Sequence, residues 1–178
     1  MYAYFIGKIT YENGEPVKSV PVEMTSQGVH VNGLDARKWI SAGYACHLFG
    51  GAKGGTNGGA DGAYIKAVYD QVDEVTAPVV NITSGLTVGF RYLQFGMKSP
   101  GTVTVQVNAL EDVIVNVRLD DYKGKCVASI KMKKGDTEIT SKLAAAVIGK
   151  HAVYFEFLGN SGKSAEIPVA EFLRFSFD

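Results

Sequence analysis

Serine and cysteine nucleophiles, histidine bases and carboxylates are the side chains in this sequence that could take part in a reaction, and none of them forms a known catalytic pattern. A serine or cysteine nucleophile needs a base beside it. Ser41, Cys46 and His47 lie close together in the chain, but no Gly-x-Ser-x-Gly turn surrounds them. Hydrolysis of a glycosidic bond needs two carboxylates that flank the bond, and no motif singles out such a pair among the 18 Asp and Glu residues. We therefore expect no catalytic residues in this chain.

The histidines and cysteines lack the spacing of a metal site. His30, His47 and His151 are scattered along the chain, and Cys46 and Cys126 do not form a Cys-x-x-Cys pair. The sequence therefore predicts no zinc site. It leaves open whether the two cysteines form one disulfide bond or remain free thiols.

The segment 50–62 reads GGAKGGTNGGADG, so seven of its thirteen residues are glycine. A phosphate-binding loop would continue into Gly-Lys-Ser/Thr at the start of a helix. This segment has neither feature. We interpret it as a flexible loop between two strands.

Apolar and polar residues alternate through much of the chain, which is the pattern of strands with one buried face. The clearest runs cover residues 102–109, 113–119, 153–157 and 173–177. Turn sequences such as Asn13-Gly14 and Ser99-Pro100-Gly101 separate the strand-like segments. Short strands at this spacing predict an all-β sandwich or barrel. Two segments, 64–73 and 142–148, could be helical, and a strand is favoured for the first of them.

The charge balance and hydropathy exclude two kinds of partner. Lys plus Arg equals Asp plus Glu, at 18 each. A neutral chain has no general attraction for a phosphate backbone, so we expect no nucleic-acid partner. No run approaches the roughly 18 apolar residues that cross a bilayer, so we expect no membrane partner. The first residues also lack an export signal, and if Met1 is an expression start, such a signal would lie upstream.

Four segments in the second half of the chain follow one another with the order and spacing of a known strand pattern. They are GFRYLQFG at 89–96, VNVRLD at 115–120 before Gly124, GKHAVYFEF at 149–157, and EFLRF at 171–175. Together they resemble the family 6 carbohydrate-binding modules that follow family 43 glycoside hydrolases. The resemblance implies a jelly-roll β-sandwich of two antiparallel sheets, a fold class that the alternation also predicts.

The resemblance implies a non-catalytic module of a secreted or cell-surface bacterial glycoside hydrolase. Such a module would hold the enzyme on a plant cell-wall polysaccharide of the xylan or arabinan class. Its partners would be a polysaccharide or oligosaccharide and the catalytic domain of the parent enzyme. Tethering raises the local substrate concentration even when binding is weak. Two alternatives stay open: an accessory domain that packs on the catalytic domain without binding free sugar, and a hydrolase in its own right.

The sequence departs from the family at the usual sugar-binding cleft. In the family, two aromatic rings and an asparagine bind sugar at the loop end of the sandwich. The matching positions here are Thr87, the segment 133–141, which has no aromatic residue, and Val169. This cleft is therefore expected to be degenerate. The resemblance also implies a structural calcium ion, for which Glu171 matches an acid on the last strand, whereas Ser41 stands where an acid of the first strand is expected.

Five further residues are candidates for contacts with sugar. The apolar C–H face of a pyranose stacks on aromatic rings, which makes Trp39, Tyr64, Tyr69 and Tyr122 candidates. Burial in the core is the favoured interpretation for the first three. For Tyr122, which lies in an acidic turn, an exposed ring and a packed ring are equally favoured. Asp121 could bind a cation or sugar hydroxyls, although a solvated turn residue is favoured.

The first 33 residues have a strand pattern of their own around Asn13-Gly14. They are similar to the end of a family 43 catalytic domain, where two strands joined by such a turn precede a linker. We therefore expect a hairpin and linker over 1–33, left from an upstream hydrolase domain. The carbohydrate-binding-module-like sandwich is expected over 34–178.

Overall fold

The computed structural model describes residues 5–22, 33–52, 62–66, 77–159 and 166–178. Within these ranges the chain is built from strands, and one 3-10 turn (η1, Ala42–Tyr44) is the only helical element. The all-β prediction is therefore confirmed. No helix among the described residues is long and apolar enough to cross a membrane.

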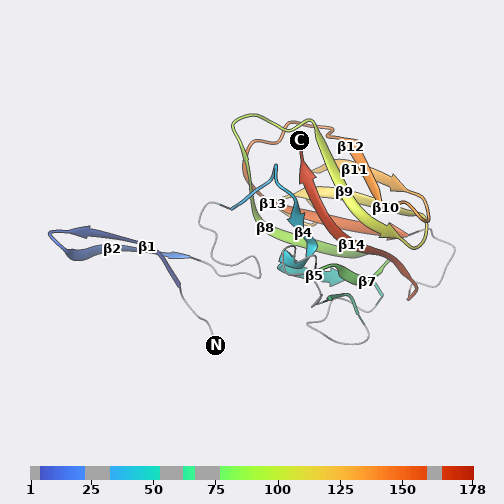
Figure 1. The fold of residues 1–178 in the computed structure, drawn as a ribbon, viewed down its shortest axis with the longest axis horizontal. Helices are drawn as coiled ribbons and strands as arrows, with labels where there is room; N and C mark the ends of the chain where they lie inside the picture. Colours follow the sequence, from blue (N-terminus) through green and yellow to red (C-terminus); the bar gives the residue numbers. More distant parts are fainter. Residues whose placement is uncertain (1–4, 23–32, 53–61, 67–76, 160–165) are drawn as a thin grey trace.

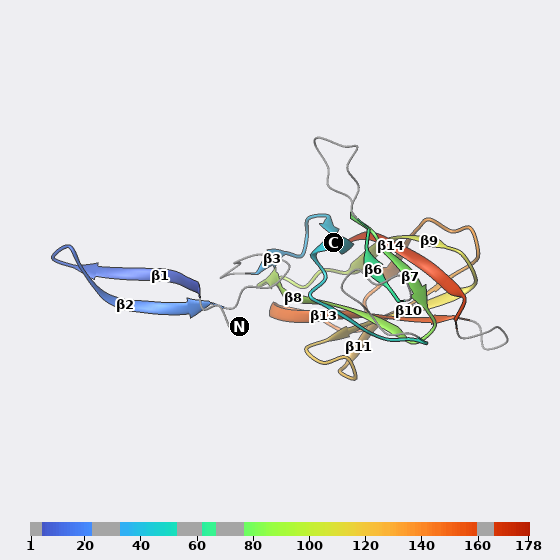
Figure 2. The same ribbon diagram turned by 90° about the horizontal axis from the view of Figure 1, so that it is seen from below.

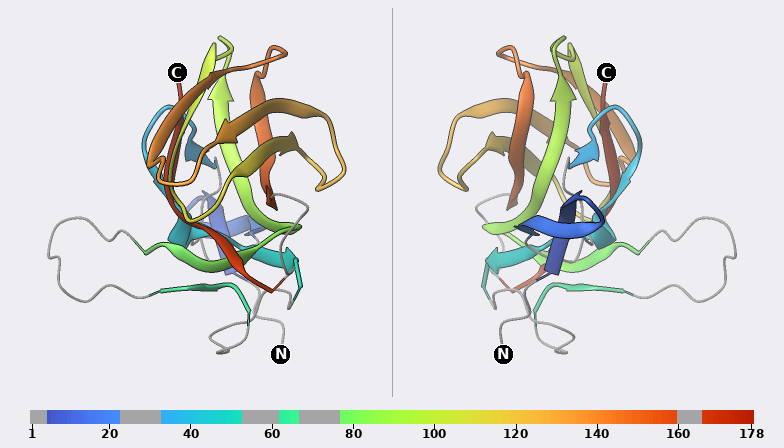
Figure 3. Two further views of the ribbon diagram at one scale, coloured as in Figure 1. Left: turned by 90° about the vertical axis from the view of Figure 1, so that its right-hand side faces the viewer. Right: turned by 90° about the vertical axis from the view of Figure 1, so that its left-hand side faces the viewer.

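Two sheets form a sandwich (Figure 1), and Figure 3 shows its layers from their ends. The sheet that we call the β8 sheet has the order β11-β10-β13-β8, with β3 and β5 both pairing with β8. Its strands are β3 (Leu34–Asp35), β5 (His47–Gly50), β8 (Leu86–Gly96), β10 (Val113–Leu119), β11 (Cys126–Met132) and β13 (Gly149–Gly159). The pair β3–β8 is parallel, and the other pairs of this sheet are antiparallel.

The second sheet, which we call the β9 sheet, has the order β12-β9-β14-β7-β6, with β4 also pairing with β14. All of its pairs are antiparallel. Its strands are β4 (Ile40–Ser41), β6 (Tyr64–Ile65), β7 (Val79–Thr83), β9 (Thr102–Ala109), β12 (Glu138–Lys142) and β14 (Pro168–Phe177). The two predicted runs 102–109 and 113–119 correspond residue for residue to β9 and β10.

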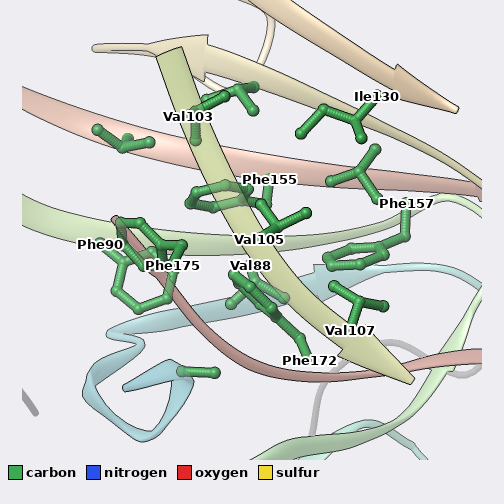
Figure 4. Close-up of a cluster of buried hydrophobic side chains, with 14 of the residues drawn as sticks. Val88, Phe90, Val103, Val105, Val107, Ile130, Phe155, Phe157, Phe172 and Phe175 are labelled. Carbon is green, nitrogen blue, oxygen red and sulfur yellow. The ribbon is translucent and has the colours of Figure 1, made fainter. Parts of the chain in front are cut away.

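A cluster of phenylalanines joins the two sheets at the centre of the sandwich (Figure 4). Phe175 of β14 has no exposed surface, and its ring centroid lies 4.8 Å from that of Phe90 on β8 and 4.6 Å from that of Phe155 on β13. Tilted and edge-on ring contacts of this kind add stabilisation beyond the apolar area that they bury. Alternate residues of both sheets point into this core, so the other residues of each strand form the two outer faces.

The segment 142–148 is not a helix, because its backbone N–H groups bond to neighbouring segments. Leu143 donates to the carbonyl oxygen of Gly101 at 2.9 Å, and Ala144 donates to that of Val127 at 2.7 Å. Val147 donates to Ser99 Oγ at 2.9 Å. The helical alternative for this segment is therefore wrong. In the other candidate, 64–73, only Tyr64–Ile65 is a described strand, and residues 67–73 lie outside the described ranges.

The two cysteines are free thiols, which resolves the alternative that the sequence leaves open. Cys46 Sγ lies 3.4 Å from the carbonyl oxygen of Gly89, and Cys126 Sγ lies 3.2 Å from that of Ala128. Each thiol thus has a local acceptor within its own part of the fold.

The first described strands, β1 (Phe5–Glu12) and β2 (Glu15–Val22), form an antiparallel hairpin. Its turn has positive φ angles at Asn13 and Gly14, as in the type I′ turns that suit hairpins. The hairpin forms a sheet of its own and pairs with no described strand of the sandwich (Figures 1 and 2).

Candidate functional site

Tyr122 lies in the turn between β10 and β11, and the turn is held by local hydrogen bonds. Asp121 Oδ1 accepts from the backbone N–H of Lys123 at 2.7 Å, and the Asp121 carbonyl accepts from that of Gly124 at 2.8 Å. A Cβ at position 124 would come within 2.2 Å of the Leu119 carbonyl oxygen, so only glycine fits there. Asp121 therefore shapes the turn that carries Tyr122.

The turn curls over the outer face of the β8 sheet. Tyr122 meets Phe49 of β5 edge-on, with 5.1 Å between the ring centroids. In the sheet order, β13 and β8 separate β10 from β5, so the turn crosses these strands to make the contact. Tyr122 keeps 42% of its surface exposed, and Lys123 Nζ lies 5.2 Å from its ring centroid. The result is an accessible aromatic ring that overhangs a sheet face.

The floor below this ring is aromatic and closely packed. The Tyr154 ring on β13 stacks on His47 of β5, with 6.3 Å between centroids and 25° between planes. The intervening strand β8 has Gly89 at this point, where a Cβ would lie 2.8 Å from the Tyr154 ring. The absence of a side chain at Gly89 therefore allows Tyr154 to lie flat across the sheet.

A charged group lies next to this floor. Glu156 Oε2 accepts hydrogen bonds from Arg118 Nε and Nη2 and from Asn116 Nδ2, at 3.1–3.3 Å. Arg118 Nη1 also donates to the Gly124 carbonyl at 3.2 Å, which ties the Tyr122 turn to the sheet. The side chains of Arg118 and Glu156 remain 24% and 26% exposed. Within the described part of the chain Glu156 Oε1 accepts no hydrogen bond, so it is available for a ligand hydroxyl.

The same sheet face continues into a hollow at the other end of β10. The hollow measures about 400 Å³ and is lined by Asp112, Val113, Ile114, Lys131, Met132, Lys133, Leu158 and Gly159. Lys133 Nζ donates to Asp112 Oδ2 at 2.8 Å. This hydrogen bond, together with the negative charge of Asp112, raises the pKa of Lys133 above its usual value. The face thus runs from an aromatic end, through a charged centre, to an apolar end with a charged rim.

The ion pair at this rim yields a titration prediction. We expect Asp112→Asn to lower the pKa of Lys133 toward its ordinary value, because both the hydrogen bond to a carboxylate and its charge are lost. Since the raised pKa favours the charged lysine in the folded protein, the pair stabilises the fold at neutral pH, and that contribution is lost as the pH rises through the lysine range. An NMR titration of the Lys133 side chain measures the pKa. An identical value in both proteins would contradict the assignment.

The structure places the predicted sugar contacts on different parts of the sandwich. Tyr122 and Asp121 share the turn over the β8 sheet. Trp39 precedes β4 in the β9 sheet and is 44% exposed, so the interpretation that it is buried in the core is wrong. Tyr64 lies half-buried on β6, and Tyr69 lies outside the described residues. Among the predicted contacts in the described ranges, only Tyr122 and Asp121 are therefore brought together.

The positions of the family's usual cleft carry no exposed ring. Thr87 on β8 and Val169 on β14 are both buried. Glu171, the expected calcium ligand, accepts a hydrogen bond from Asn108 Nδ2 at 3.0 Å. Ser41 Oγ accepts from the backbone N–H of Gly43 at 3.2 Å. Across the described ranges, no three His, Cys, Asp or Glu residues are close enough to hold a metal ion, so the calcium expectation has no ligand set there.

Sequence reasoning missed Phe49, His47, Tyr154 and Glu156 as parts of this face. Tyr154 and Glu156 do alternate with the inward residues Val153, Phe155 and Phe157, and this alternation was the available signal for their outward direction. Their neighbours on β5 and β10 are set by strand pairing between distant segments, which the sequence pattern does not show.

Comparison with solved structures identifies the fold, whereas no protein-family model and no curated protein matches the chain. A family 6 carbohydrate-binding module from Clostridium stercorarium, in complex with cellobiose, matches with a TM-score of 0.63 and 16% identity, over 84% of this chain and 98% of that module. A family 6 module from Clostridium cellulolyticum, in complex with xylose, matches with a TM-score of 0.60 and 21% identity, over 81% and 98%.

A family 43 arabinoxylan arabinofuranohydrolase from Bacillus subtilis, in complex with cellotetraose, is also similar, with a TM-score of 0.64 and 18% identity. The match covers 96% of this chain and 32% of the hydrolase, so the chain spans about a third of that enzyme's length. At these identities the similarity shows the fold. The resemblance inferred from the sequence is confirmed at that level, and the sandwich has the fold of family 6 carbohydrate-binding modules.

Proposed function

From this shared fold, we propose that the chain is a non-catalytic carbohydrate-binding module that binds a plant cell-wall saccharide of the xylan or arabinan class on the outer face of the β8 sheet. The observation that carries the proposal is the exposed Tyr122 ring, held over a face that contains the Arg118–Glu156 pair. An aromatic ring offers a surface for the apolar face of a sugar. The guanidinium and carboxylate beside it offer donors and acceptors for the hydroxyl groups around the sugar's rim.

The fixed geometry of this face supports binding of a ligand with several hydroxyl groups. Arg118 is bonded to both Glu156 and the Tyr122 turn, so the ring and the charged pair are oriented before a ligand arrives. Groups that are already ordered lose less conformational entropy on binding. The other positions of the family's usual cleft are weaker candidates, because Val169 is buried and residues 133–141 have no aromatic side chain. Thr87 pairs with Glu156 and with Phe49, so it is a buried residue within the proposed face.

The proposal includes a parent enzyme, a secreted or cell-surface glycoside hydrolase whose catalytic domain precedes this module. The family 43 hydrolase matches 96% of the chain, whereas the isolated modules match 81–84% of it. The additional part of the chain that the hydrolase matches is comparable in length to the β1–β2 hairpin. This supports a division into a hydrolase remnant over 1–33 and a binding module over 34–178.

We expect Tyr122→Ala to weaken binding to soluble arabinoxylan or xylan about tenfold, which corresponds to about 1.4 kcal/mol, because the variant loses the ring that stacks on the sugar. Isothermal titration calorimetry and affinity electrophoresis measure the effect. Tyr92→Ala is the matched control, since Tyr92 is also an exposed tyrosine with a lysine over its ring and does not lie beside Arg118. Wild-type protein that binds no plant polysaccharide would refute the proposal.

One observation favours the accessory-domain alternative. Met97 and Ile148 are strongly exposed, at 93% and 53%, and they adjoin the paired residues Gly96 and Gly149 at one end of the sandwich. Neighbouring exposed apolar side chains are typical of surfaces that contact another protein. An accessory domain would use this end to pack on the catalytic domain. If the chain is such an accessory domain, we expect it to bind no saccharide. We also expect the parent enzyme to lose stability when Met97 is replaced by a charged residue.

A further inference from the structure

Over β9, β12 and the Arg174 part of β14, the outer face of the β9 sheet is polar, and the exposed Trp39 ring lies at its edge. The outward residues of β9 alternate with the buried Val103, Val105 and Val107. The partly exposed polar side chains on this face of β9, β12 and β14 include Gln106, Asn108, Glu138, Thr140, Glu171 and Arg174, whereas Thr104 and Ser176 are buried. Trp39 lies beside this set, immediately before β4, and is 44% exposed.

Three of these side chains, together with Trp39, form a continuous row across the sheet. Gln106 Nε2 donates to Glu138 Oε2 at 2.5 Å, and Arg174 Nε donates to Gln106 Oε1 at 2.7 Å. The Arg174 guanidinium carbon lies 4.7 Å from the centroid of the Trp39 ring. The row crosses β12, β9 and β14 and ends beside β4, so at about 4.8 Å per strand it extends over roughly 14 Å.

The composition of this face fits a saccharide better than a protein partner. The buried centre of a protein interface is depleted of charged residues, whereas this face has hydroxyl, amide and charged groups beside the Trp39 ring. A sugar has the same division, an apolar C–H face and a polar rim. Because Arg174 lies over one face of the Trp39 ring, the sugar would contact the exposed remainder of the ring while its rim contacts the row. The row also orders Arg174 beside Trp39 in advance, which lowers the entropic cost of binding.

We propose that Trp39, Arg174, Gln106 and Glu138 form a second polysaccharide-binding surface, separate from the one on the β8 sheet. The outer faces of the two sheets point in opposite directions across the core, so a module with both surfaces holds two polysaccharide chains and bridges them. The proposal of the second surface does not depend on the proposed function of the β8 sheet face. The bridging of two chains rests on the proposed function of the β8 sheet face.

Trp39 is the only tryptophan in the chain, so its fluorescence reports on this surface alone. We expect xylo-oligosaccharides to change the tryptophan emission of the full 178-residue chain, and to do so equally in the Tyr122→Ala variant. Tryptophan emission that does not respond to saturating xylo-oligosaccharide in either protein would overturn the second surface. Arg174→Gln should weaken the response at least fivefold, because the ring loses its ordered neighbour and the row loses a charged donor.

Affinity electrophoresis in soluble arabinoxylan separates the two surfaces. We expect Trp39→Ala and Tyr122→Ala each to retain weakened binding, and the double variant to lose at least a further tenfold. Only the wild type, Trp39→Phe and the control Tyr92→Ala should cross-link arabinoxylan, measured as a rise in viscosity. Circular dichroism establishes that each variant is folded.

The outcomes distinguish the two proposals. If Trp39→Ala binds and cross-links like the wild type while Tyr122→Ala binds no polysaccharide, the second surface is refuted and the proposed function stands. If Trp39→Ala abolishes binding and Tyr122→Ala has no effect, the second surface stands and the β8 sheet site is refuted. Wild-type protein that binds arabinoxylan without raising its viscosity would refute the bridging of two chains.

Discussion

Phe175→Ala is expected to lower the free energy of unfolding by about 3–5 kcal/mol, the range for removing a buried phenylalanine side chain. Phe175 has no exposed surface, and its ring contacts Phe90 and Phe155 in the opposite sheet and Phe172 and Phe177 in its own strand. Alanine would leave a cavity where the two sheets meet, because a sandwich held by pairing in both layers cannot collapse fully into the gap. The loss is a large share of the roughly 5–15 kcal/mol that stabilises a typical domain.

Urea unfolding followed by circular dichroism measures this loss, and thermal melting should show a decrease in Tm of roughly 6–20 °C. Phe175→Leu is the graded control, since it keeps most of the volume and should cost less than alanine. Met97→Ala is the surface control, since Met97 is 93% exposed and should change stability by less than about 0.5 kcal/mol. A Phe175→Ala protein with the same unfolding midpoint as the wild type would show that the phenylalanine cluster does not hold the sheets together.

The sandwich could be predicted because the alternation of apolar and polar residues within each strand shows which of its faces is buried. Val103, Val105 and Val107 alternate with polar residues, and that period of two fixes which side of β9 is buried. The same reasoning failed for 142–148, where apolar composition was compatible with a helix. The N–H groups of that segment bond to Gly101, Val127 and Ser99 instead, and those partners belong to distant parts of the chain.

The candidate site was less predictable because its residues meet through strand order rather than through spacing. Tyr122 was identified from its turn, but its contact with Phe49 depends on the turn crossing β13 and β8. The exposure of Trp39 was missed for a different reason. The strand that follows it, Ile40–Ser41, has two residues, which is too short for alternation to indicate that Trp39 points away from the buried Ile40.

Arg118→Ala is expected to reduce saccharide binding at the β8 sheet more strongly than Tyr122→Ala, by at least 30-fold, or about 2 kcal/mol. Arg118 has two functions in the proposed site. It is a donor beside the aromatic floor, and through Gly124 it fixes the turn that carries Tyr122. Its removal also leaves Glu156, which is 26% exposed, with Asn116 as its remaining partner among these side chains. Hydrogen bonds to charged groups contribute about 1.5–3 kcal/mol each, so losing both functions exceeds the loss of one ring.

A double-mutant cycle between Arg118→Ala and Tyr122→Ala, measured by calorimetry with soluble xylan, tests this coupling. If Arg118 positions the turn, the two losses should not add, and the interaction energy should reach at least about 0.5 kcal/mol. Arg118→Lys keeps the charge but loses the planar fork that contacts Glu156 and Gly124 together, so we expect it to bind nearly as weakly as the alanine variant. Lys134→Ala removes a positive charge from the exposed pair with Glu111 and should leave binding unchanged. Additive losses, with Arg118→Lys restoring full affinity, would mean that Arg118 supplies only charge and that the Tyr122 turn holds its position without it.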